Sequence, residues 1–237
     1  METTLIETPA GLTAAVRAAL SARADPTRAA QQQRYMKSSM PYHGLTTPQL
    51  RAALAPIWAR LSLPGPGAWR AAVADLWDTA GHREERYAAV GLLQLPRHRA
   101  WVEHFDPATV ALLRHLIVTG AWWDHVDAIA GRPVGDGLRA RPDAWTPVLR
   151  EWAHDPDLWL RRAAIICQLL SREATDLELL TEAIEASSDD RDFFARKAIG
   201  WALRQHARTD PEWVRGFLAS HAATLSPLSV REASKHL

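Results

Sequence analysis

Four similar segments recur along the chain, and their spacing constrains its fold more than any other feature. They are REERYAAVGLL from Arg83, WWDHVDAIAG from Trp122, WLRRAAIICQLL from Trp159 and FFARKAIGWALRQH from Phe193. Their starts lie 34 to 39 residues apart, and each is expected to be the second helix of a pair, after a shorter first helix. This period is typical of an α-solenoid of HEAT-like helical-pair repeats, whose second helices line an extended concave surface.

Start signals for helices agree with an all-α fold. A capping residue followed by proline recurs at Asp25-Pro26, Thr47-Pro48, Asp106-Pro107, Asp155-Pro156, Asp210-Pro211 and Ser226-Pro227. Between these points apolar residues lie three and four apart, and no stretch shows a convincing strand pattern. The pattern predicts roughly twelve helices. No long linker interrupts them, so residues 1–237 are interpreted as a single domain.

Composition narrows the class of protein. The net charge is only +1, and no apolar run is long enough for a membrane span. The N-terminal stretch METTLIETPAGLTAAV lacks a basic region, so no secretory signal is expected. The single cysteine, Cys167, lies in an apolar run and is expected to be a small buried hydrophobe in a reducing, cytoplasmic setting. A monomer is expected.

Arginine supplies 25 of the 28 basic residues, because lysine occurs only at Lys37, Lys197 and Lys235. The planar guanidinium suits phosphate groups, but a GC-rich genome would produce the same bias.

Aromatic and histidine residues have mostly structural interpretations. Large aromatics are expected to fill the core between repeats at Trp58, Trp69, Trp77, Trp145, Trp152 and Trp213, with Trp101 in a loop or interface. Four histidines are expected in loops or at the surface: His82, His98, His104 and His115. The histidines show no metal-binding spacing, so no metal site is predicted.

The segment from Trp122 is the best candidate for a functional site. Trp123 and Asp127 are four residues apart and share one helix face, so Trp122 is expected to point toward the core. Asp124, near the helix start, is interpreted as a cap or an ion-pair partner. Asp127 lies in the helix interior, where the alternative is an ordinary solvated or salt-bridged aspartate.

Matching positions in other repeats extend this candidate site. The next repeat carries Arg161 and Arg162, of which only one can face the same way. In the repeat after it, Trp201 follows Gly200, and a glycine inside a helix requires a reason of packing or access. Near the N-terminus, Arg34, Tyr35 and Lys37 gather at a helix end. In a curved solenoid one concave surface would carry Trp123, Asp127, an arginine, Trp201 and Tyr35.

Five motifs in order resemble the AlkD-like DNA alkylation repair enzymes over essentially the whole chain. They are RYMK (34 to 37), W-W-D-x-V-D (122 to 127), W-L-R-R-A-A-I (159 to 165), A-I-G-W-x-L-R (198 to 204) and L-S-x-R-E-A-x-K-H (228 to 236). Members of this family are HEAT-like-repeat DNA glycosylases that excise cationic N3- and N7-alkylpurines.

The resemblance implies a role for each matching residue. It implies that Asp127 is catalytic, that Trp123, Trp201 and Tyr35 contact the lesion and sugar, and that Arg162, Arg161, Lys37 and Arg204 bind DNA phosphates. It also implies a double-stranded DNA partner, no metal, no nucleotide or other cofactor, and no full extrusion of the base. Repair would then bring this cytoplasmic protein to the nucleoid. The segment SSMPYHGL, with Pro41 and His43, departs from the family pattern, and His125 has no assigned role.

This chemistry suits the residue types. An alkylated purine already carries positive charge and leaves easily, and the deoxyribose left behind resembles an oxocarbenium ion. A fixed carboxylate stabilises that charge and can position water, while tryptophan faces attract cations. Two alternatives remain open from the residues: a non-catalytic module that binds distorted or branched DNA, and a scaffold that binds protein.

Overall fold

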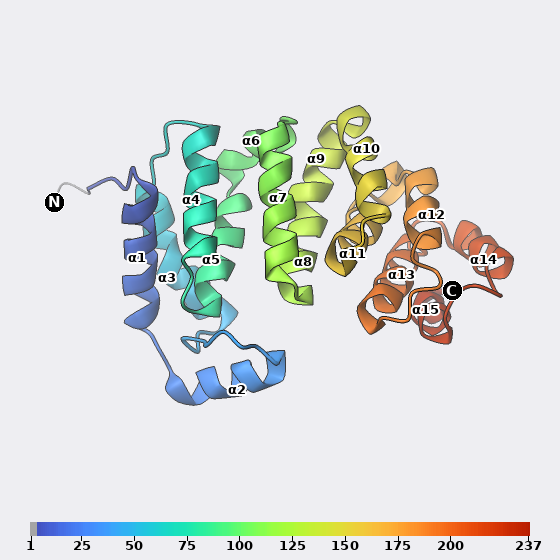
Figure 1. Ribbon diagram of the computed structural model, residues 1–237, viewed down its shortest axis with the longest axis horizontal. Helices are drawn as coiled ribbons and strands as arrows, with labels where there is room; N and C mark the ends of the chain where they lie inside the picture. The colour runs from blue at the N-terminus through green and yellow to red at the C-terminus, as the bar shows by residue number, and fades with distance from the viewer. Residues whose placement is uncertain (1–3) are drawn as a thin grey trace. The chain divides into compact units, whose positions relative to one another are not determined.

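The structure is a computed structural model that describes residues 4–237, so the first three residues of the N-terminal stretch lie outside the described part. Its regular elements are helices, apart from one isolated parallel β-bridge between Ile6 and Leu61 (Figure 1). The prediction of an all-α fold is confirmed. Among the described helices, none combines the length and the apolar character that crossing a bilayer requires.

Contacts divide the described chain into two compact units. The first ends at Arg97 and the second begins at His98. A short 3-10 turn, Pro96–His98, spans this boundary. The interpretation of the whole chain as one domain stays a prediction, and the two units are described separately below.

The first unit is built on five helices. They are α1 (Pro9–Ser21), α2 (Pro26–Met36), α3 (Thr47–Arg60), α4 (Pro66–Asp78) and α5 (Arg83–Leu93). Helix α1 packs against α3, α4 and α5, and α4 pairs with α5. Trp69 and Trp77 of α4 are fully buried in this core. The helix from Arg83 is therefore the second helix of a pair, as predicted.

A loop between α2 and α3 is fixed by a buried carboxylate of α5. Glu84 accepts hydrogen bonds from the backbone N–H groups of His43, Gly44 and Leu45, at 2.9, 2.8 and 3.1 Å. Gly44 has φ +92°, and a Cβ there would lie 2.2 Å from the carbonyl oxygen of Asp25. The loop therefore requires glycine at this position both for its conformation and for its close approach to α2.

The second unit contains the remaining helices. They are α6 (Arg99–Glu103), α7 (Pro107–Gly120), α8 (Trp123–Ile129), a π-helix (Ala130–Val134), α9 (Gly135–Ala140), α10 (Pro142–Ala153), α11 (Leu158–Ile166), a 3-10 turn (Arg172–Ala174), α12 (Leu177–Glu185), α13 (Phe193–His206), α14 (Pro211–Ser220), α15 (Pro227–Ala233) and a 3-10 turn (Ser234–His236).

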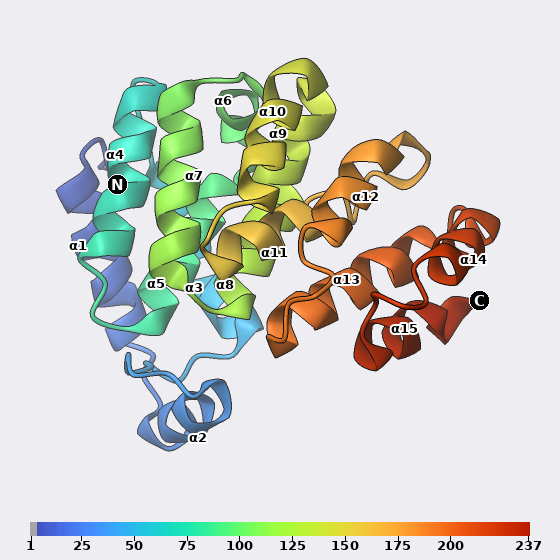
Figure 2. The ribbon, with the colours of Figure 1, turned by 45° about the vertical axis from the view of Figure 1, so that its right-hand side comes forward.

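These helices stack as pairs within the second unit. The second helices contact one another in chain order, α8 with α11, α11 with α13 and α13 with α15, while the first helices α10 and α12 also pack together (Figure 2). The paired-helix arrangement of a solenoid is thus present here. The expectation of shorter first helices is wrong for α7 and α8, which have 14 and 7 residues, and for α10 and α11, which have 12 and 9. It is right for α12 and α13, which have 9 and 14 residues.

The Asp-Pro and Ser-Pro signals mark most helix starts correctly. The cap side chain accepts a backbone hydrogen bond at Asp25, Asp106, Asp210 and Ser226. Helix α3 is capped by Thr46, one residue before the predicted cap. The Asp155-Pro156 prediction is wrong, because Asp157 caps α11 and Asp155 instead accepts from the backbone of Asp157.

Most of the predicted core aromatics are buried. Trp69, Trp77, Trp145 and Trp152 are fully buried, whereas Trp58 and Trp213 are half-buried. Trp101, expected in a loop or interface, lies on the short helix α6 and is half-buried. The expectation of a surface position for His98 is wrong, since its buried ring stacks on Trp101 with centroids 4.6 Å apart.

Cys167 is buried as predicted, and burial raises the pKa of its thiol to about 12. A thiol with so high a pKa is not a nucleophile at neutral pH.

Candidate functional site

The chain enters α8 through an unfavourable backbone conformation. Ala121 has φ 40°, a left-handed conformation that costs a non-glycine residue roughly 1–2 kcal/mol. Trp122 follows in an extended conformation and occupies the N-cap position, so the alternative that Asp124 caps this helix is wrong. Strain of this kind is concentrated at functional sites.

Helix α8 presents Trp123 and Asp127 one turn apart, and both are half-buried. Beyond Ile129 the helix widens into a π-turn over Ala130–Val134. Pro133 within this turn has no N–H to donate to the preceding turn, which favours a change of helical register. Turns of this type occur frequently at functional sites.

An ion pair between Asp127 and Arg162 is the centre of the site. Arg162 Nε donates to Asp127 Oδ1 at 2.8 Å, and Nη2 donates to Oδ2 at 2.9 Å. The Arg162 side chain is 5% exposed and that of Asp127 is 15% exposed. The two parallel bonds fix the carboxylate plane as well as its position.

Arg162 also joins three successive second helices. It lies on α11, binds Asp127 on α8, and donates from Nη1 to the carbonyl oxygen of Phe194 on α13 at 2.7 Å. One guanidinium therefore sets the spacing between the carboxylate and the first turn of α13.

Burial acts on Asp127 more strongly than its partner does. Desolvation raises the pKa of Asp127, while the hydrogen bonds and charge of Arg162 oppose this rise. The carboxylate is thus poorly solvated and held by a single cation. A second positive charge placed near this carboxylate is therefore attracted to it more strongly than it would be in water.

An aromatic cluster packs beside the ion pair. The ring of Phe194 lies 5.3 Å from Trp122 and 5.1 Å from Trp159, measured between centroids, and the Arg162 guanidinium lies 6.0 Å from the Phe194 ring. Trp122 therefore packs against α11 and α13, as the expectation of a core-facing ring required, although it is only half-buried. The role of Phe194 was missed by sequence reasoning, and the FF pair that begins α13 was its only signal.

Trp201 lies on α13 seven residues after Phe194, which places the two on the same helix face. Its side chain is half-buried. Gly200 has a packing reason, because a Cβ there would lie 2.5 Å from Glu232 Cβ and 2.9 Å from the carbonyl oxygen of Ser229 on α15. Close contact between α13 and α15 thus fixes the part of α13 that carries Trp201.

The other two predicted phosphate-binding arginines, Arg161 and Arg204, are also engaged within the protein. Arg161 pairs with Asp190 at 2.8 Å and donates to the carbonyl oxygens of Asp155 and Pro156. Arg204 pairs with Glu232 at 2.7 Å. Arg161 and Arg162 therefore point to different partners, as expected of neighbours on a helix. Phosphate binding by Arg161, Arg162 and Arg204 stays a prediction.

Tyr35 and Lys37 belong to the first unit, at the end of α2. Tyr35 is 80% exposed, and exposed Lys37 ends the helix in a left-handed conformation with φ 51°. A surface that these residues share with Trp123 and Asp127 stays a prediction.

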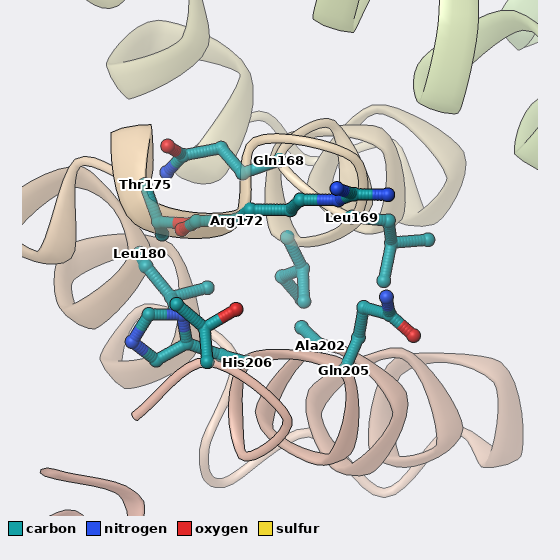
Figure 3. Close-up of a pocket in the computed structure, with 10 residues that line it drawn as sticks. Gln168, Leu169, Arg172, Thr175, Leu180, Ala202, Gln205 and His206 are labelled. Atoms are coloured by element: carbon teal, nitrogen blue, oxygen red, sulfur yellow. The ribbon is translucent and has the colours of Figure 1, made fainter. Parts of the chain in front are cut away.

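The second unit also contains a small cavity between α11 and α13 (Figure 3). Its lining includes Gln168, Arg172, Gln205 and His206, and none of the predicted site residues. Its volume of about 20 Å³ admits one water molecule but no nucleobase. This cavity is therefore not a pocket for a flipped base.

The fold and site together define an all-α protein of stacked helical pairs, with a carboxylate–guanidinium pair and aromatic rings on successive second helices. The chain belongs to the family of DNA alkylation repair enzymes, whose model matches residues 16–237. The resemblance inferred from the five motifs is thereby confirmed, and the protein has a role in the repair of alkylated DNA.

A solved structure agrees with this assignment. The chain is similar to a structure described as a predicted DNA alkylation repair enzyme from Enterococcus faecalis, with 28% sequence identity and a TM-score of 0.78. The match covers 91% of this chain and 97% of that one. No curated protein sequence matches the chain.

Proposed function

We propose that this protein is a monofunctional DNA glycosylase that hydrolyses the N-glycosidic bond of cationic N3- or N7-alkylpurines in duplex DNA. The observation that carries the proposal is the carboxylate of Asp127, which is largely desolvated and held in one orientation by two hydrogen bonds from Arg162. The family assignment supplies the substrate class, alkylated DNA.

In the proposed reaction the bond between C1′ and the purine nitrogen breaks, and its electron pair neutralises the positive charge on the base. The deoxyribose becomes an oxocarbenium ion. In this proposal the negative charge of Asp127 stabilises the ion, and its carboxylate accepts the proton of the water that attacks C1′. No general acid is needed, since the alkylated base leaves as a neutral molecule.

The tryptophans supply selectivity for charged lesions. The rings of Trp123, on the Asp127 face of α8, and Trp201, on the Phe194 face of α13, are half-buried. Attraction of a cation to an indole face contributes about 0.5–2 kcal/mol, which favours an alkylated nucleotide over a normal one. Tyr35 is the proposed contact from the first unit.

The cations Arg161, Arg162, Lys37 and Arg204 are proposed to hold the phosphate backbone without reading sequence. Three of the five N–H groups of Arg162 are used by Asp127 and Phe194. We therefore give Arg162 a positioning role first, with its remaining N–H groups directed to phosphate. Catalysis without full base extrusion follows from the family resemblance.

The proposal is tested by release of 7-methylguanine from methylated duplex DNA. Asp127→Asn keeps the size and polarity of the side chain, and we expect it to lower the single-turnover rate by about 100-fold or more while DNA binding survives. Asp124→Asn, on the same helix, is the matched control and should stay within a few-fold of the wild type.

Other outcomes point to the alternatives. DNA binding without base release by the wild type would indicate a non-catalytic module for distorted or branched DNA. No retention on immobilised duplex DNA even at low salt would indicate a protein-binding scaffold.

A further inference from the structure

Three metal-ligand side chains converge in the first unit, far from Asp127 in the sequence. His43 lies in the loop between α2 and α3, His82 precedes α5, and Glu85 is in the first turn of α5. Their ligand atoms all lie within 4.8 Å of one another. His43 Nε2 and His82 Nδ1 are each 3.5 Å from the same oxygen, Glu85 Oε1.

One nitrogen of this cluster lacks a well-formed hydrogen bond. The His43 side chain is only 6% exposed, and its buried Nε2 atom makes no hydrogen bond of good geometry, since Glu85 Oε1 lies 3.5 Å away. A buried imidazole nitrogen without a partner costs free energy. This nitrogen is aimed at a carboxylate oxygen that is also largely buried, since the Glu85 side chain is 3% exposed.

Neighbouring groups hold the cluster in place. The Oε2 atom of Glu85 accepts from Arg17 Nε and from the Gly81 N–H, both at 3.0 Å, which leaves Oε1 turned toward the two histidines. Glu84 binds the backbone N–H of His43 at 2.9 Å. Outer hydrogen bonds of this kind orient the ligands of metal sites.

The charges of the surroundings permit a divalent cation. Glu84 and Glu85 carry two negative charges, and Arg17 carries one positive charge. The two imidazole rings are stacked with centroids 3.8 Å apart.

We propose that His43, His82 and Glu85 bind a zinc ion. Two imidazole nitrogens and one carboxylate oxygen form a frequent zinc ligand set, with a fourth position for water, and nitrogen ligands disfavour magnesium and calcium. The three side chains line one pocket, together with Arg17, Ser21 and Thr79. The stacked rings must turn toward a common point, and His82 is 37% exposed and so has room to rotate.

The bound ion would fasten the loop that contains His43 to the start of α5. This inference does not depend on the glycosylase proposal, because the two sites use different residues of different units. Sequence reasoning missed the cluster because 39 residues separate His43 from His82, so no local spacing reveals it.

The test is isothermal titration of the full-length protein with zinc chloride at pH 7.5, after dialysis against a chelator. We expect one ion per chain, no heat with magnesium chloride, and at least roughly 10-fold weaker zinc binding in His82→Gln and in Glu85→Gln. His104→Gln, at an exposed histidine, is the matched control and should bind zinc like the wild type.

His82→Gln is the decisive variant because it leaves the core intact. Its side chain makes no cap hydrogen bond to α5, whereas a substitution at buried His43 could unfold the unit. Circular dichroism checks the fold of each variant. No zinc binding by the wild type, or equal binding by a folded His82→Gln variant, would overturn the proposal.

Discussion

At the scale of single residues, the buried Asp127–Arg162 pair is not by itself a source of folding stability. Removing two charges from water is expensive, and an apolar pair of the same size is often as stable or more so. The pair is therefore better explained by what it fixes than by stability. It holds a carboxylate at a constant place relative to α8, α11 and α13.

The elevated pKa of Asp127 predicts the acid limit of activity. In the proposed glycosylase reaction only the ionised carboxylate stabilises the sugar cation, and burial raises the pKa of Asp127 above its ordinary value of 3.8. Base release should therefore fall as pH decreases through a value above 3.8. A single-turnover pH profile measures this limit. A rate that stays constant down to pH 3.8 in folded protein would contradict the prediction.

Loss of Arg162 should destabilise the protein, because Asp127 is left buried and unpaired. We expect Arg162→Ala to lower the free energy of unfolding by about 3–5 kcal/mol at neutral pH, measured by urea denaturation. Arg161→Ala is the control. Its pair with Asp190 is more exposed, so a loss of roughly 1 kcal/mol or less is expected. Adding Asp127→Asn to Arg162→Ala should restore part of the stability. A further loss of stability in the double variant would show that the unpaired charge of Asp127 does not cause the destabilisation.

At the scale of elements, the contact between α13 and α15 depends on the absence of a side chain at Gly200. Gly200→Ala should force the helices apart and cost about 1–3 kcal/mol, as measured by thermal or urea unfolding. Gly216→Ala is the matched control within α14, since a Cβ there meets nothing within 4 Å. That substitution should stabilise the helix by up to about 1 kcal/mol. Equal effects of the two substitutions would exclude the packing explanation.

Helix types and most helix starts could be predicted because they follow from local rules. A cap and a proline act within one turn, so Asp106 and Asp210 mark their helices directly. The start of α11 was misplaced because Asp155 and Asp157 compete for the same role. The nearer residue, Asp157, caps the helix and Asp155 binds its backbone.

The candidate site could be predicted only in part, because helical spacing is a local rule and contacts between repeats are not local. Helical spacing places Trp123 beside Asp127, but the partner of Asp127 is 35 residues away. Periodicity places Arg162 in the repeat next to that of Asp127, but it does not indicate whether the guanidinium binds a carboxylate or a phosphate. Only three-dimensional contacts show that it binds Asp127 and the backbone of Phe194.

At the scale of the whole molecule, the net charge of +1 means that affinity for DNA must come from a few local cations. The four proposed phosphate contacts predict that the logarithm of affinity falls with the logarithm of salt concentration with a slope of about −3.6. Lys37→Gln should reduce this magnitude by about 1. Fluorescence anisotropy with duplex DNA at several salt concentrations measures both slopes. An unchanged slope in Lys37→Gln would show that Lys37 does not contact the DNA phosphates.

The π-turn after α8 marks a place where this chain can lose a residue. A π-turn holds one residue more than the α-helical turn that it replaces. Deleting one residue from 130–134 would therefore restore a regular α-helix, and α9 would keep its direction relative to Asp127. Beyond the turn the packing is close, because a Cβ at Gly137 would be 2.6 Å from the indole of Trp145, so a deletion within α9 would rotate that contact by about 100°. An alignment with relatives whose helix is regular here should therefore place a one-residue gap within 130–134.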